Sequence, residues 1–169
     1  MTLDEINALD QEQFVTALGG LFEGPPWIVT SAWQRRPFAS SRDLLDALCS
    51  IMYSAPRERQ IALIQAHPDL AGKAALAGTL GPASAGEQAA AGLGSLSPDE
   101  LARFTELNAA YREKFGFPFV ICARLRTKEE ILQSFGGRLS NSPDQETRTA
   151  LDEIGKICSL RLNDLLAAT

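Results

Sequence analysis

The stretch SPDQETRTALDEIGKICSLRLNDLLA, residues 142–167, decides the fold class of this chain. It opens with Ser142-Pro143-x-Gln145, which matches a capping box, in which a serine caps a helix and the third helical residue bonds back to it. Apolar residues follow at helical spacing, namely Leu151, Ile154, Ile157, Cys158 and Leu165. They share one face, so the segment predicts a long amphipathic helix from residue 143 to about residue 167.

The same start signal recurs along the chain. It is found at Thr2-x-x-Glu5, Ser84-x-x-Glu87, Ser97-Pro98-x-Glu100 and Thr127-x-x-Glu130, and each occurrence predicts a helix start. The helix after Ser97 is expected to reach about residue 115 and to bury Leu101, Phe104, Leu107 and Tyr111. Further helices are expected over 11–18, from Ser40 or Ser41 through Met52, and from Pro56 to Ala66, with short helices and loops over 70–83.

One segment resembles a strand. Phe117-Pro118-Phe119-Val120-Ile121-Cys122-Ala123 is apolar, but Pro118 and the lack of a partner strand favour an extended connector instead. The chain shows no internal repeat and no domain boundary, and its 169 residues suffice for one core. The sequence therefore predicts a single compact all-α domain over residues 1–169, with about eight helices.

The composition excludes several kinds of partner. The net charge of −5 argues against nucleic acid and against an anionic membrane surface. No apolar run is long enough to span a bilayer, and the N-terminus is acidic where a signal peptide would be basic. Three dispersed cysteines, Cys49, Cys122 and Cys158, suit reduced, buried thiols rather than disulfides or a metal cluster. A cytoplasmic location is expected.

His67 is the only histidine in the chain. Imidazole is the side chain whose ordinary pKa lies nearest neutrality, so proton transfer at pH 7 would use it first. Pro68 favours an extended or turn conformation at His67 and ends the preceding helix. Two interpretations remain open: an imidazole that caps a backbone carbonyl at the helix end, and a functional imidazole displayed at a junction between helix and loop.

Arg161 and Glu87 each allow two interpretations. Arg161 shares the apolar stripe of Ile154, Ile157 and Cys158, so it either extends to the stripe's edge or is a buried guanidinium aimed at an anion. Glu87 either completes a capping box with Ser84 or, with Gln88, binds polar ring atoms of a ligand. The Phe119–Ala123 connector would offer free backbone groups to a flat heterocycle if it is not in a sheet.

Several long motifs together resemble the 2-oxo-4-hydroxy-4-carboxy-5-ureidoimidazoline (OHCU) decarboxylase family. They are Ala66-His67-Pro68-Asp69-Leu70-Ala71-Gly72-Lys73, Ser84-x-x-Glu87-Gln88-x-x-Ala91-Gly92-Leu93, Lys114-Phe115-Gly116 with the connector and Arg124, and Glu153-Ile154-x-Lys156-Ile157-x-x-x-Arg161-Leu162. The resemblance covers nearly the whole chain. It implies an all-α enzyme without metal or organic cofactor that commonly forms homodimers and converts OHCU to (S)-allantoin and CO2 in urate breakdown.

The resemblance also implies the site residues. The family's essential histidine, glutamate and arginine fall on His67, Glu87 and Arg161. Its substrate-binding positions fall on Pro68, on Ser84, Ala85, Gly86, Glu87 and Gln88, and on Phe119, Val120, Ile121, Cys122 and Ala123. His67 is then expected to perform acid–base chemistry, Glu87 to orient His67 or the ureido group, and Arg161 to stabilise charge during decarboxylation.

Two other classes of function compete with this one. A helical binding module would bind an allantoin-like heterocycle without converting it. An all-α interaction domain with a structural His-Pro turn would have no polar pocket near His67.

Overall fold

The computed structural model describes residues 1–168 and, among these, the side chains of all but residues 73 and 74. The α-helices are α1 (Leu3–Ala8), α2 (Gln11–Leu18), α3 (Trp27–Trp33), α4 (Ser41–Ser54), α5 (Arg57–Gln65), α6 (Lys73–Leu76), α7 (Pro82–Ala90), α8 (Pro98–Phe115), α9 (Lys128–Leu139) and α10 (Pro143–Ala167). Two 3-10 turns, η1 (Gly19–Leu21) and η2 (Ala123–Leu125), complete the set. The described part contains no strand, which confirms the predicted all-α domain.

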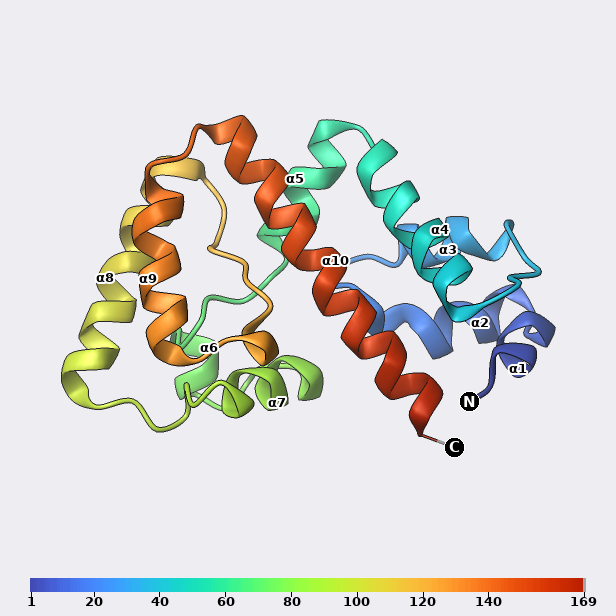
Figure 1. Ribbon diagram of the computed structural model, residues 1–169, viewed down its shortest axis with the longest axis horizontal. Coiled ribbons are helices and arrows are strands. Elements are labelled where there is room, and N and C mark those ends of the chain that lie inside the picture. Colours follow the sequence, from blue (N-terminus) through green and yellow to red (C-terminus); the bar gives the residue numbers. More distant parts are fainter. Residues whose placement is uncertain (169) are drawn as a thin grey trace.

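Helix α10 organises the molecule. It runs obliquely through the centre, with α6 to α9 on one side and α1 to α4 on the other (Figure 1). Its apolar stripe is buried as predicted at Leu151, Ile154, Ile157 and Cys158, whereas Leu165 is half-buried near the helix end. In α8 the residues Phe104, Leu107 and Tyr111 are buried, and Leu101 is half-buried. Within residues 1–168, no helix combines the length and hydropathy needed to cross a membrane.

Most capping boxes form as predicted. Both reciprocal hydrogen bonds are present at the starts of α1, α8, α9 and α10. The prediction for Ser84 and Glu87 was wrong, because α7 begins at Pro82 with Gly81 as its N-cap residue. Proline's fixed φ suits the first helical position, so the helix starts before Ser84. Ser84 and Glu87 therefore lie inside the helix, and their side chains are free for tertiary contacts.

A serine that caps a helix should matter more for stability than a serine placed inside the first turn. Ser142→Ala should lower the free energy of unfolding by about 1 kcal/mol, because Ser142 caps the long α10. A urea titration with an unchanged slope would measure the loss. Ala83→Ser is the matched control, since residue 83 lies exposed in the first turn of α7, and it should change stability little. Equal stability of Ser142→Ala and the wild type would contradict the role of the cap.

The connector between α8 and η2 is buried without being in a sheet. Gly116 ends α8 in the left-handed region at φ +77°, a conformation that glycine adopts without strain. From Phe117 to Ala123 the chain then passes through the core with Phe117, Phe119, Val120, Ile121, Cys122 and Ala123 all buried. The prediction of an extended connector is confirmed, and its position brings residues 119–123 opposite α7 and α10.

Candidate active site

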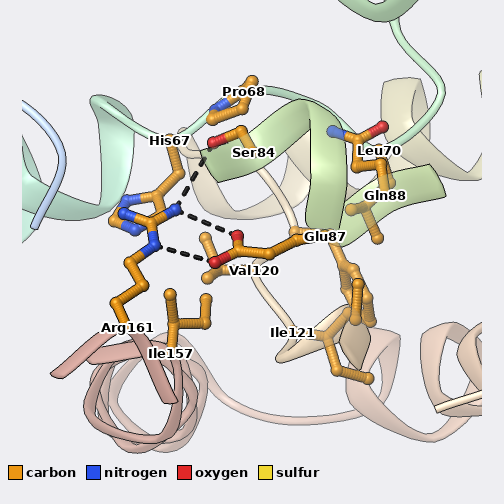
Figure 2. Close-up of a pocket in the computed structure, with 12 residues that line it drawn as sticks. His67, Pro68, Leu70, Ser84, Glu87, Gln88, Val120, Ile121, Ile157 and Arg161 are labelled. Carbon is orange, nitrogen blue, oxygen red and sulfur yellow. Dashed lines mark hydrogen bonds and ion pairs between the residues drawn. The ribbon is translucent and has the colours of Figure 1, made fainter. Parts of the chain in front are cut away.

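A pocket lies where the end of α5, the helix α7, the connector and the helix α10 meet (Figure 2). It is lined by His67, Pro68, Leu70, Ser84, Glu87, Gln88, Phe119, Val120, Ile121, Ala123, Ile157 and Arg161. Most of the residues predicted from the sequence are therefore brought together from four distant segments. A polar pocket beside His67 is also the feature that a purely structural His-Pro turn would lack.

Three predicted site residues lie elsewhere. Ala85 and Gly86 are exposed on other faces of α7, since a helix turns about 100° per residue and only Ser84, Glu87 and Gln88 face the pocket. Cys122 is buried, and its backbone N–H donates to Oε2 of Glu153 over 2.9 Å. Conversely, the pocket includes Leu70 and Ile157, which were not predicted to line it.

His67 combines the two interpretations that the sequence left open. Helix α5 ends at Gln65, and Nδ1 of His67 lies 2.9 Å from the carbonyl oxygen of Leu63, one turn back. The imidazole thus caps the helix and also lines the pocket, with 7% of the residue exposed. Because a carbonyl can only accept, Nδ1 carries the hydrogen in the neutral ring and Nε2 is left as the acceptor. No other protein group within residues 1–168 bonds the imidazole.

Arg161 is partnered within the protein. Its Nε and Nη2 donate to the two carboxylate oxygens of Glu87 over 2.8 and 3.0 Å, and Nη2 also lies 3.5 Å from Oγ of Ser84 (Figure 2). Nη2 donates to Oε1 of Glu23 as well, over 3.2 Å. Nη1 donates to the carbonyl of Gly20 over 3.1 Å. Of the two interpretations left open for Arg161, the structure shows the buried guanidinium, since the residue is 9% exposed. The anions that it faces belong to the protein itself, namely Glu87 and Glu23.

Burial alone would lower the pKa of Arg161, but the hydrogen bonds and charges of Glu87 and Glu23 outweigh it and raise this pKa. The guanidinium therefore stays charged.

Glu23 is a member of this cluster that sequence reasoning missed. Its Oε1 accepts from Ser84 Oγ over 2.9 Å as well as from Arg161. The only local sign was an acidic residue between buried Phe22 and the turn at Gly24-Pro25. Glu87 was expected to orient either His67 or the ureido group of the substrate. It accepts from Arg161, and the Leu63 carbonyl rather than Glu87 orients the imidazole.

The loop after His67 is held by two amide side chains. Gln88 accepts from the N–H of Ala71 over 3.0 Å and donates to the carbonyl of Asp69 over 3.3 Å. Asn108 donates to the carbonyl of Leu70 over 2.8 Å. Gln88 thus lines the pocket, but both ends of its amide are engaged by the loop.

The connector keeps fewer free backbone groups than its sequence suggested. The carbonyl of Val120 accepts from Arg138 over 2.6 Å, and the N–H of Cys122 is taken by Glu153. The N–H and C=O of Ile121 have no hydrogen-bond partner in the part of the chain that the structure describes. Among those same residues, no three His, Cys, Asp or Glu side chains are placed to hold a metal ion together.

Comparison with known proteins gives a consistent result. The sequence model of the OHCU decarboxylase family matches residues 7–163. A 2-oxo-4-hydroxy-4-carboxy-5-ureidoimidazoline decarboxylase of Amia calva is 44% identical over 98% of this chain and 95% of its own length. The mouse protein of the same name is 42% identical over 99% and 94%. A crystal structure of (S)-allantoin synthase superposes with a TM-score of 0.79 at 27% identity, covering 98% of this chain and 54% of the other.

Fold, pocket and comparisons together define an all-α enzyme of the lyase class. The chain belongs to the OHCU decarboxylase family and is a decarboxylase of urate degradation, which confirms the family and enzyme class predicted from its motifs.

Proposed function

We propose that this enzyme converts OHCU to (S)-allantoin and CO2 in the pocket around His67. The observation that carries the proposal is the placement of the His67 imidazole, whose Nδ1 lies 2.9 Å from the Leu63 carbonyl oxygen in a pocket that Arg161 and Ile121 also line. In the neutral ring this contact leaves Nε2 as the acceptor. The names of the relatives and the description of the allantoin synthase structure support the same reaction.

The reaction can proceed on the substrate's own bonds. When the bond between the ring carbon and the carboxylate breaks, its electron pair forms a C=C bond to the neighbouring ring carbon. The pair of the adjacent C=N bond moves to the ring nitrogen, which takes up a proton. The resulting enol loses its hydroxyl proton while the ureido-bearing carbon gains one, which gives allantoin.

His67 is placed to move this proton. Since Nε2 is an acceptor in the neutral ring, the imidazole takes the hydroxyl proton of the enol and then returns it to one face of the resulting enolate, at the ureido-bearing carbon. A single fixed face would account for the formation of one enantiomer.

Arg161 supplies the positive charge of the site. A guanidinium has five N–H donors, and its bonds to Glu87, Glu23 and Gly20 occupy four of them, which leaves one on Nη1 for a substrate oxygen. Because two carboxylates fix its position, the planar guanidinium is pre-organised and needs no reorientation during the reaction. Glu87 and Glu23 thus act through Arg161.

A direct assay tests the proposal. OHCU generated in situ from urate is mixed with the enzyme, and circular dichroism follows the appearance of optically active allantoin while CO2 release is measured. Faster formation of the (S) enantiomer than in the uncatalysed control supports the function. Binding of allantoin without CO2 release would instead identify a binding module and contradict it.

The rate should fall on acidification. Burial lowers the pKa of His67 below its ordinary 6.5; the charge of Arg161 lowers it further, while the Leu63 bond, Glu23 and Glu87 oppose the shift. We expect kcat/KM to be constant above pH 6.5 and to fall as the pH drops through the lowered pKa. The contribution of His67 to the free energy of unfolding has the same pH dependence. It is fully present above the pKa of His67 in the unfolded chain and is lost as the pH falls through the lowered pKa of the folded state. An acidic limb centred above 6.5 would contradict this assignment.

The reaction should need no added metal, because the C=N bond of the substrate accepts the electron pair. Activity should therefore survive exhaustive dialysis against EDTA. Replacement of Cys49 or Cys158 by alanine should affect stability rather than chemistry, since neither lines the pocket. Recovery of a dialysed, inactive enzyme on addition of a divalent cation would contradict the prediction.

A homodimer in the cytoplasm is the assembly and location that we propose from the family resemblance. Light scattering coupled to size-exclusion chromatography would test the dimer, and fractionation of the source cells the location.

A further inference from the structure

An ion pair that the reaction does not use lies behind the pocket wall. Arg138 on α9 pairs with Glu146 on α10, and the two residues are 7% and 0% exposed. The hydroxyl of Tyr111 donates to Glu146 over 2.6 Å, and Asn141 donates to its other oxygen over 3.0 Å. Neither charged residue lines the pocket, so neither can contact a substrate bound there.

Arg138 nevertheless holds the pocket wall at two consecutive residues. Its Nη1 donates to the carbonyl of Val120 over 2.6 Å, and its guanidinium carbon lies 4.2 Å from the centroid of the Phe119 ring. The Phe119 ring is also stacked on Phe135, with centroids 3.7 Å apart. Because Phe119 and Val120 both line the pocket, Arg138 fixes a side chain and a main-chain group of its wall.

This anchor also sets the direction of the next residue. The Val120 carbonyl and the Cys122 N–H are both engaged away from the pocket, by Arg138 and Glu153. In an extended chain the backbone groups of successive residues point to opposite sides. The N–H and C=O of Ile121, a pocket residue, are thus directed the other way, as a donor and an acceptor for an amide-like ring edge.

The stability of the fold does not by itself require this ion pair. Desolvation of two buried charges is costly, and well-packed apolar residues of similar volume often replace such a pair without loss of stability. Apolar residues would lose the bond to Val120 and the charged contact with Phe119. We therefore infer, building on the proposed function, that Arg138 is a positioning residue that holds Phe119 to Ile121 in the orientation required by the substrate ring.

A triple variant tests this inference. Tyr111→Phe, Arg138→Met and Glu146→Leu together replace the buried polar cluster with apolar side chains and leave no charge unpaired. The variant should fold and melt near the temperature of the wild type, because removal of two buried charges offsets the lost donor to the Val120 carbonyl. Its KM for OHCU should rise at least about tenfold, as for the loss of a hydrogen bond to a charged donor, while kcat changes less. A merely structural role would lower kcat with the folded fraction and leave KM unchanged.

Arg57→Met is the matched control, because Arg57 pairs with Asp144 on the surface and 58% of its side chain is exposed. It should keep the wild-type KM. An unchanged KM in the folded triple variant overturns the inference, as does a fall in kcat alone. If the triple variant does not fold, Arg138→Lys keeps a charge for Glu146 without the planar fork, and an unchanged KM in that variant overturns the inference.

The test also separates this inference from the proposed function. If the wild type does not turn over OHCU, the proposed function fails. Calorimetric binding of (S)-allantoin then still tests the anchor, and equal affinity of the wild type and the triple variant overturns it.

Discussion

Replacement of His67 by alanine should lower kcat by at least about 100-fold, the loss typical of removing an acid–base group. The effect should be this large because His67 is the only histidine and its Nε2 is the acceptor beside the substrate pocket. Steady-state rates with OHCU generated in situ, followed by circular dichroism, measure it. Activity of His67→Ala near that of the wild type would remove His67 from the mechanism.

His67→Asn separates the two roles of the imidazole. An asparagine amide can occupy the position of Nδ1 and donate to the Leu63 carbonyl, but it offers no base of suitable pKa. We expect this variant to melt close to the wild type and to be as inactive as His67→Ala. An active asparagine variant would show that His67 serves to cap α5 and not to transfer protons.

Arg161→Met should both destabilise the protein and abolish activity. The substitution leaves Glu87 and Glu23 close together without their shared cation, and removal of one partner from a buried pair costs roughly 3–5 kcal/mol. Urea unfolding and the allantoin assay measure the two effects, and a variant as stable as the wild type would contradict the ion-pair cluster.

Two further variants divide the effect of Arg161 into charge and shape. Arg161→Lys keeps a cation for Glu87 and Glu23 but loses the planar guanidinium, so its stability should be intermediate and its kcat/KM reduced.

Glu87→Gln removes one carboxylate and leaves Glu23 as the counter-ion of Arg161. It should lose activity through a misplaced guanidinium, because Gln cannot form the bidentate pair. Full activity of Glu87→Gln would limit Glu87 to a packing role.

The starts of the helices could be predicted because their determinants are local. A capping box joins residues three apart, as between Ser97 and Glu100 or Ser142 and Gln145, and this spacing is visible in one dimension. The failure at Ser84 has an equally local cause, since Pro82 begins α7 earlier. The stripe of α10 was likewise visible, and it placed Arg161 on the buried face of the helix, although the burial of the guanidinium itself stayed open until the structure showed it.

The partners of these residues were decided by the tertiary structure. Arg161 meets Glu87 and Glu23 across 74 and 138 positions of sequence, and no periodicity relates such distant residues. Arg138 reaches Val120 for the same reason, through the packing of α9 against the connector. The all-α class, the helix starts marked by capping boxes other than that of α7 and, through the motifs, the family follow from local sequence alone. Only the packed core determined which charges pair, since a buried ion pair depends on a low-dielectric contact that forms when distant segments meet.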